Sequence, residues 1–305
     1  MIFTIKMSVK LSIILINYNA SSYTINAVKS IIEIIDSNLS YEIIVVDNCS
    51  TEAELTYLKD NINDYKNLVL IESFVNLGFS GGNMIGASRA TGEYFAFVNN
   101  DTLFSEDCFS ILINYLEKNK NVGVITCLSK NSEGVNFYCF DHFLGIRKFV
   151  SGRFLLETFF NKSKRGKEYD YPIEVDAVQG CFMMFKKLIF NEVGGFDTNL
   201  FLFYEEIDIC KRLNDKGFTS VFYPSTYFTH FQGISTVKSM GMKNELLISY
   251  LYILKKDFGV IRFLIISSIL IIKYSFKSIY KPKNIVFLKI IFSKNRFDYS
   301  LKNKS

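Results

Sequence analysis

The chain has 305 residues, of which 49% are hydrophobic and only three are proline, so it is long enough for one large or two modest, mostly ordered domains. Its six scattered cysteines form no Cys-x-x-Cys pair, which argues against a zinc ribbon or a thioredoxin-like site and is typical of reduced thiols in the cytosol. The first ten residues contain no long apolar stretch, and we expect no cleaved signal peptide.

The net charge of +5 is unevenly distributed along the chain. Residues 243–305 carry 13 Lys or Arg and three acids, a net charge of +10, whereas residues 1–242 carry 22 basic and 27 acidic side chains, a net charge of −5. A basic tail on an acidic body favours an anionic partner surface. The tail lacks the mixture of polar and aromatic residues expected for nucleic acid, and its apolar content favours the cytoplasmic, inner face of the cell membrane.

The first 126 residues alternate between short aliphatic runs and stretches with helical spacing. Strands are predicted at 11–16, 42–46, 68–71, 94–98 and 122–126, and helices at 21–36, 51–61, 80–90 and 106–117. Thr51 and Glu54 resemble a capping box at the start of the second helix. This alternation predicts an α/β fold, an open and mainly parallel twisted sheet flanked by helices.

The pattern weakens between residues 129 and 172 and then resumes. Strands are predicted at 175–178, 181–185, 219–222 and 226–231, and helices near 187–191 and at 205–216. Two or three helical segments follow residue 243. We therefore predict one domain at 1–242 and a basic, apolar helical region at 243–305.

Polar residues follow three of the predicted strands. They are Asn17–Asn19 after the first strand, Asp47 after the second and Asn99–Asp101 after the fourth. Ligands bind at the carboxyl edge of open α/β sheets, and a carboxylate there can hold a divalent cation that in turn holds a diphosphate. The simpler interpretation is a set of capped turns, with Asp47 as a helix N-cap.

A glycine-rich turn at residues 76–83 leads into the third predicted helix. Gly78 and its neighbours would let the backbone approach a ligand, and a helix N-terminus favours phosphate. The spacing fits neither the dinucleotide fingerprint nor a P-loop, so the segment alone is a weak signal.

Three acids, Glu205, Glu206 and Asp208, open the predicted helix at 205–216. Carboxylates in a first turn suit the helix dipole, but one that lies beside a bound sugar could act as a general base. His230 ends an apolar stretch, for which a structural role is the simpler interpretation.

Together and in this order, these segments resemble the family-two inverting glycosyltransferases with a GT-A fold, particularly the bacterial rhamnosyltransferase-like branch. The matching stretches are 13–19, 45–50, 76–83, 97–102, 194–197, 204–210 and His230. They span residues 11 to about 235, so the resemblance does not cover the C-terminal region.

The resemblance implies a hexosyl- or deoxyhexosyltransferase of cell-surface polysaccharide synthesis. It would use a nucleoside-diphosphate sugar, a divalent cation (Mn or Mg) and a glycan or lipid-linked acceptor. The implied donor-binding residues are Asn17, Asn19, Asp47, Asn76, Gly78, Asn83, Asn99 and Asn100. The implied metal ligands are Asp101 and His230, and we expect acceptor contacts at Gly180, Asp197 and Asp208.

The resemblance also implies roles for single residues. Asp47 looks like the residue that reads the nucleobase, and Glu206 looks like the catalytic base, with Glu205 as a rival. Asn99 stands where many relatives have a first metal-binding acid, so only one carboxylate, Asp101, would touch the metal. A single displacement would then invert the anomeric carbon without an enzyme nucleophile.

Two other functions fit the sequence less well. A nucleotidyltransferase would need a basic glycine-rich loop after the first strand, where residues 17–22 contain no Lys or Arg. A catalytically inactive sugar-nucleotide-binding module would not need the set Asp101, Glu206 and His230.

The C-terminal region leaves two interpretations open. Its apolar run at 263–272 is shorter than the roughly 20 residues that a helical span needs, and extending it brings in Lys273 and Lys277. We therefore expect the region to dock on a membrane surface. The alternative is that it packs on the catalytic domain or on a second subunit.

Overall fold

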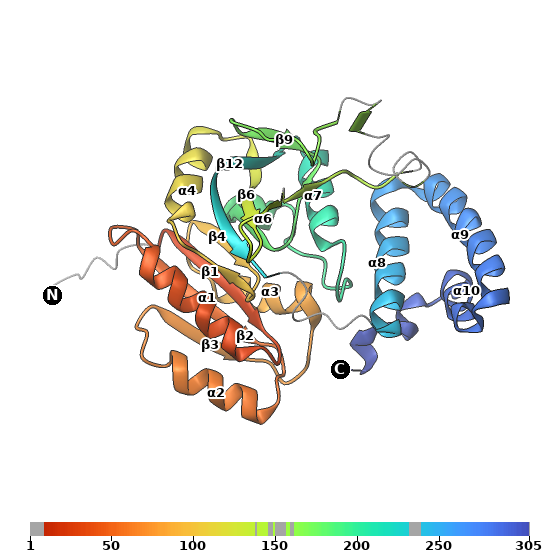
Figure 1. Ribbon diagram of the computed structural model, residues 1–305, viewed down its shortest axis with the longest axis horizontal. Helices are drawn as coiled ribbons and strands as arrows, with labels where there is room; N and C mark the ends of the chain where they lie inside the picture. The colour runs from red at the N-terminus through yellow and green to blue at the C-terminus, as the bar shows by residue number, and fades with distance from the viewer. Residues whose placement is uncertain are drawn as a thin grey trace.

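The computed structural model describes residues 9–137, 139–145, 149, 157–158, 162–231 and 239–304. A central sheet carries helices on both faces, and a layer of C-terminal helices lies beside it (Figure 1). The first half contains β1 (Leu11–Asn17), α1 (Ser21–Ile34), β2 (Tyr41–Asp47), α2 (Glu52–Ile62), β3 (Leu68–Glu72), α3 (Gly78–Arg89), β4 (Tyr94–Val98), β5 (Thr102–Leu103), α4 (Cys108–Lys118) and β6 (Val122–Lys130).

The second half contains shorter strands and the longest helices. Its elements are β7 (Asn136–Phe137), β8 (Phe140–Asp141), β9 (Ile173–Val175), β10 (Ala177–Val178), β11 (Phe182–Lys186), α6 (Lys187–Glu192), α7 (Glu205–Asp215), β12 (Thr219–His230), α8 (Met240–Phe258), α9 (Val260–Tyr280) and α10 (Ile285–Phe292).

The strand order of the main sheet is β3-β2-β1-β4-β11-β6-β12-β5. β1 pairs in parallel with β2 and β4, and β2 pairs in parallel with β3, which confirms the predicted open sheet. β11 enters between β4 and β6 and is antiparallel to both. Its residues Phe182–Phe185 are fully buried, so burial of both strand faces explains its central place.

Two of the strand predictions differ from the structure. The two strands predicted at 219–222 and 226–231 form one strand, β12, whose pairing with β6 is irregular between Tyr223 and Tyr227. Pro224 lies at this irregularity, where its missing N–H interrupts the ladder. The strand predicted at 175–178 is divided, because β9 pairs with β12 whereas β10 pairs with β8.

The predicted capping box at α2 is wrong. Thr51 is the N-cap but its side chain makes no capping hydrogen bond, and its N–H donates to Asn19 Oδ1 at 2.8 Å. The Glu54 carboxylate instead accepts from the backbone N–H of Ser21 at 2.9 Å. A contact between α2 and the start of α1 therefore replaces the local cap.

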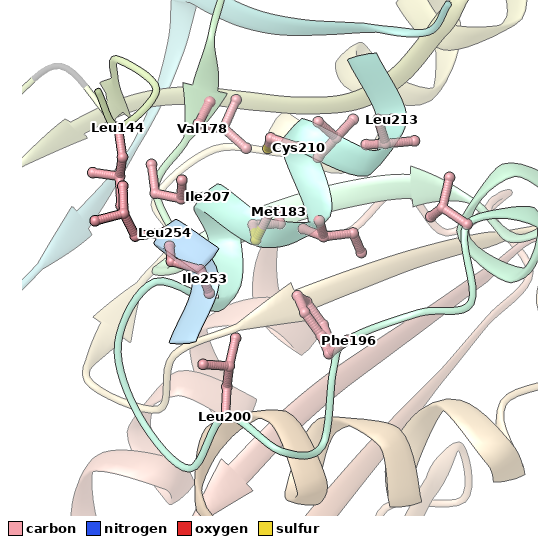
Figure 2. Packing of buried hydrophobic residues seen from close by; sticks show 14 of the residues in the cluster. Leu144, Val178, Met183, Phe196, Leu200, Ile207, Cys210, Leu213, Ile253 and Leu254 are labelled. Carbon is pink, nitrogen blue, oxygen red and sulfur yellow. The ribbon is translucent and has the colours of Figure 1, made fainter. Parts of the chain in front are cut away.

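Apolar clusters cover both faces of the sheet, and α8 belongs to one of them. Figure 2 shows Ile253 and Leu254 of α8 beside Ile207 of α7, and all three are buried. The predicted boundary at 242 lies in the first turn of α8, which begins at Met240 and packs its buried side chains on the sheet domain. No helix in the described part of the chain combines the length and apolar content needed to cross a membrane.

Candidate active site

A cavity of about 940 Å³ opens at the carboxyl edge of the sheet. Its walls come from the start of α3, the turn after β4, the residues before β11, the segment before α7, the end of β12 and α8. It brings together ten of the predicted site residues: Asn76, Gly78, Asn83, Asn99, Asn100, Asp101, Gly180, Glu205, Glu206 and His230. The other five, Asn17, Asn19, Asp47, Asp197 and Asp208, do not line it.

Asp101 and His230 meet although 129 residues separate them in the chain. The short strand β5 pairs with the end of β12 and sets His230 opposite Thr102, and the N–H of Phe231 donates to the Asp101 carbonyl at 3.0 Å. The His230 Nε2 then lies 3.1 Å from Asp101 Oδ1. Burial would lower the pKa of His230, but its hydrogen bonds with Asp101 and Cys181 raise this pKa to about 10.

The Asp101–His230 pair fits a divalent cation that arrives with a substrate. Within the described residues, no group of three or more His, Cys, Asp or Glu could hold a metal by itself. Mg²⁺ is usually held by one or two carboxylates, with substrate phosphates and water filling its other positions. The Asp101 carboxylate faces this cavity and could supply such a ligand. The His230 imidazole could join it only after losing its proton to the arriving cation, because a histidine that ligates a metal must be neutral.

The turns after β1, β2 and β4 are joined by a buried hydrogen-bond network. The Asn17 side-chain amide donates to Asp47 Oδ1 at 2.8 Å, and the Ser50 N–H donates to Asp47 Oδ2 at 3.0 Å. The Thr24 hydroxyl donates to Asn17 Oδ1 at 2.8 Å and accepts from the Asn100 amide at 3.0 Å. Asn17 and Asp47 thus hold the turns of the sheet edge together without lining the cavity. Recognition of the nucleobase by Asp47 stays a prediction.

The turn residues Asn19 and Cys49 have left-handed backbones, with φ of 49° and 69°. A positive φ is uncommon for residues other than glycine, and Asn adopts it more often than most. The N–H of Asn19 donates to Ser50 Oγ at 2.9 Å, so this conformation locks the two turns together. Tyr18, which precedes Asn19, lines the cavity and is 46% exposed.

Gly78 joins the cavity wall at the start of α3 to the segment before α7. Its φ is +68°, and a Cβ added here would lie 2.1 Å from the carbonyl oxygen of Phe201. That carbonyl accepts from the N–H of Phe79 at 2.8 Å. The Asn48 side chain donates to Asn76 Oδ1 and to the Gly78 carbonyl. The close approach that requires this glycine is therefore to Phe201, whereas the sequence predicted an approach to a ligand.

The two candidate catalytic acids follow a strained turn. Phe203 and Tyr204 have φ of 73° and 68°, a left-handed conformation that costs about 1–3 kcal/mol per non-glycine residue and is frequent at functional sites. Glu206 lines the cavity near Gly180, at which an added Cβ would lie 4.0 Å from the Glu206 Cβ. The strained turn therefore places Glu205 and Glu206 in the cavity wall.

The two acids differ in environment. Glu205 is 7% exposed, and its Oε2 has no hydrogen-bond partner among the described residues. Burial first, and then the charge of Glu206, raise the pKa of Glu205 well above its usual value. This shift favours a protonated Glu205, which leaves Glu206 as the better proton acceptor.

Asp197 and Asp208 lie in a cluster of ion pairs between α7 and α8. Lys256 pairs with both carboxylates, Tyr252 donates to Asp197 at 2.8 Å, and Arg212 donates to Asp208. Burial would raise the pKa of Asp197, but the hydrogen bonds from Lys256, Asn199 and Tyr252 lower it to about 2. These contacts hold α8 on the catalytic domain, and acceptor binding by Asp197 and Asp208 stays a prediction.

The cavity also contains residues that sequence reasoning missed. Tyr18 and Tyr204 lie within or beside predicted motifs, so their position alone could have suggested them. Gln179 precedes Gly180 without any recognisable signal. Met242 and Leu246 come from α8, which the sequence placed largely outside the catalytic domain.

The chain is similar to known proteins both in sequence and in fold. The family described as "Glycosyl transferase family 2" matches residues 12–191, and "N-terminal domain of galactosyltransferase" matches residues 162–234. The chain is 30% identical over 202 residues to "Rhamnosyltransferase WbbL" of Escherichia coli (strain K12). The aligned region covers 63% of this chain and 73% of that protein. It spans only 28–34% of the length of the next three relatives.

Two solved structures share the fold at low sequence identity. GalNAc-T7 with UDP, GalNAc and Mn²⁺ has a TM-score of 0.63 and 16% identity, over 82% of this chain and 48% of that one. The mannosyltransferase PcManGT from Pyrobaculum calidifontis, in complex with GDP-Man and Mn²⁺, has a TM-score of 0.58 and 16% identity, over 81% and 64%. These similarities show the GT-A fold.

Proposed function

Because the chain belongs to glycosyl transferase family 2, we propose that it transfers a hexose or deoxyhexose from a nucleoside diphosphate to a hydroxyl of a glycan or lipid-linked saccharide, with inversion. The observation that carries this proposal is the shared cavity. Asp101 lies on one wall in the turn after β4, beside His230 at the end of β12, and Glu206 lies on the wall formed by the start of α7.

The chemistry follows from these two walls. Glu206 accepts the proton of the acceptor hydroxyl while the hydroxyl oxygen attacks the anomeric carbon. The bond from that carbon to the diphosphate oxygen breaks in the same displacement, so the configuration inverts. Asp101 and His230 would hold a divalent cation, which offsets the charge that develops on the leaving diphosphate.

The comparisons support the choice of donor and cation. The two solved structures described above contain nucleotides and Mn²⁺, and the relative WbbL is named a rhamnosyltransferase. We infer that this chain uses a nucleoside-diphosphate sugar with Mn²⁺ or Mg²⁺. Its role would be in the synthesis of a bacterial surface polysaccharide.

We also infer that the protein is peripheral on the inner face of the cell membrane, as its basic C-terminal region predicts. Five apolar side chains of α9 recur at helical spacing and are 40–74% exposed; we call them the outer face of α9. They are Ile261, Ile265, Ile272, Phe276 and Ile279. An apolar helix face with nearby cations is typical of a helix that lies in a membrane interface.

The proposed function is tested by the variant Asp101→Ala. Nucleoside-diphosphate sugars carrying uracil, thymine or guanine are screened with Mn²⁺ by thermal shift, because a ligand at about 100 times its Kd stabilises the native state by about 2.7 kcal/mol. The variant should lose the Mn²⁺-dependent shift and at least about 100-fold of the transfer rate, whereas the surface variant Asp60→Ala should keep both. Normal Mn²⁺-dependent donor binding by Asp101→Ala would contradict the metal assignment.

A further inference from the structure

A second cavity, of about 770 Å³, lies between the C-terminal helices. α8 contributes Leu246, Leu247 and Tyr250 to its wall, and α9 contributes Leu270 and Tyr274. The predicted functional residues do not line this cavity.

The rim of the second cavity is strongly basic. Lys243, Lys277, Lys281 and Lys283 line it, and Asp141 is the one acid among its lining residues. None of these four lysines takes part in an ion pair within the described part of the chain. Clustered cations without a carboxylate partner favour an anionic ligand such as a phosphate.

The interior of the second cavity is apolar and aromatic. Leu247, Leu270 and Phe287 are at most 7% exposed, and the rings of Tyr274 and Phe287 lie 4.6 Å apart. Phosphate by itself would leave this wall without a partner. The combination fits an amphiphile, with an anionic group at the lysines and an apolar chain against the wall.

The second cavity adjoins the active site. Tyr204 and Leu246 line both cavities, and Tyr204 directly precedes Glu205 and Glu206. A ligand held in the second cavity could therefore extend past Tyr204 to the candidate base.

We propose that the second cavity binds the lipid-phosphate end of the acceptor, a saccharide joined through a phosphate or diphosphate to an apolar chain. The lysines bind the phosphate oxygens, the apolar wall binds the first part of the chain, and the saccharide reaches Glu206. This proposal rests on the proposed glycosyl transfer and names the class of acceptor for it.

The test measures direct binding of farnesyl diphosphate to the full-length protein, without metal or donor. The double variant Lys277→Glu with Lys281→Glu should bind this probe at least about tenfold more weakly, a loss of about 1.4 kcal/mol. The control Lys273→Glu with Lys289→Glu makes the same charge change on α9 and α10, away from the cavity, and should bind as the wild type does. Leu246→Glu, at a 41% exposed position, should also weaken binding and leave the fold intact.

Two further probes separate the parts of the ligand. Farnesol and inorganic pyrophosphate should each bind at least about tenfold more weakly than farnesyl diphosphate, because each lacks one of the two recognised groups. Pyrophosphate binding as tight as that of farnesyl diphosphate would overturn the lipid assignment and indicate a site for free phosphate. Equal binding of farnesol would overturn the phosphate assignment.

The same samples distinguish this proposal from the proposed function. Displacement of farnesyl diphosphate by UDP, dTDP or GDP with Mn²⁺ would show that the probe occupies the donor site, which would overturn the second-cavity proposal. Absence of probe binding would also overturn it. The thermal shift with nucleotide sugars in those samples reports separately on the proposed glycosyltransferase.

Discussion

The carboxyl edge of the sheet and the layer of C-terminal helices both contribute to cavities lined by Tyr204. The sheet edge buries polar side chains, whereas the helical layer exposes apolar ones. At the sheet edge, Asn17 and Asp47 are buried and hydrogen-bonded to each other. In the helical layer, Lys277 faces a cavity and Phe276 is 64% exposed. Buried polar groups must find partners inside the fold, whereas exposed apolar groups gather where another surface is bound.

The comparison suggests a division of work between the two regions. In the proposed function, the sheet edge would organise the chemical step, and hydrogen bonds join its turns. The helical layer would bind the lipid-phosphate end of the acceptor and hold the protein at the membrane surface. Variants in each region should therefore fail in different measurements.

The largest effect is expected at the candidate base. Glu206→Gln should keep donor binding and lose about 10²- to 10⁴-fold in kcat, the usual scale for removal of a general base. Glu205→Gln should retain most of its activity, because burial already favours the protonated form of that side chain. If Glu205→Gln is the inactive variant, the two roles must be exchanged.

A second variant tests the rigidity of the sheet edge. Gly78→Ala should lower the free energy of unfolding by about 2–4 kcal/mol in urea titrations, because the new Cβ meets the Phe201 carbonyl in a left-handed backbone. Gly134→Ala is the matched control, since Gly134 also has a positive φ, of +79°, and an added Cβ there has nothing within 4 Å. That control should cost about 1–2 kcal/mol, the strain alone. Equal losses would show that Phe201 does not require the glycine.

A third prediction concerns the outer face of α9. Ile272→Asp with Phe276→Asp should weaken flotation with anionic vesicles by at least about tenfold at unchanged thermal stability, because exposed apolar area and charge both favour the interface. Ser268→Asp with Ser275→Asp adds the same charge on α9 without removing apolar area, and should have a smaller effect. Unchanged flotation together with loss of a dimer on gel filtration would contradict membrane docking and favour a second subunit on this face.

The smallest effect is expected at Asp257 in α8. Burial first, and then the charge of Asp208, raise the pKa of Asp257 to about 7. Because this pKa lies above that of the unfolded chain, about 3.9, the stabilising effect of protonation is lost as pH rises from about 4 to 7.

Asp257→Asn should therefore increase the free energy of unfolding by about 1 kcal/mol at pH 8 and by less at pH 5. This figure is lower than the full pKa shift implies, because the side chain is partly exposed. Urea titrations at the two pH values measure the difference. An equal gain at both would show that ionisation of Asp257 has no part in it.

The sequence alone was sufficient for the strands and helices from β1 to β4 and for the parallel pairing of these strands. Each of these elements has a local period, and each parallel connection is a short strand–helix unit. The resemblance also selects Asp101, His230 and Glu206, and all three line one cavity. The local periodicity therefore predicted the α/β fold, and the order of the motifs predicted the residues at the centre of the candidate site.

Only the tertiary structure decided which distant segments share a surface. β11 enters the sheet between β4 and β6, and β5 pairs with β12 to set His230 3.1 Å from Asp101. The Asp197–Lys256 pair and the buried side chains of α8 join the C-terminal helices to the catalytic domain, whereas the sequence left open whether this region docks on a membrane or packs on protein. Such contacts depend on burial and pairing between residues far apart in the chain, which leave no period or spacing in the sequence.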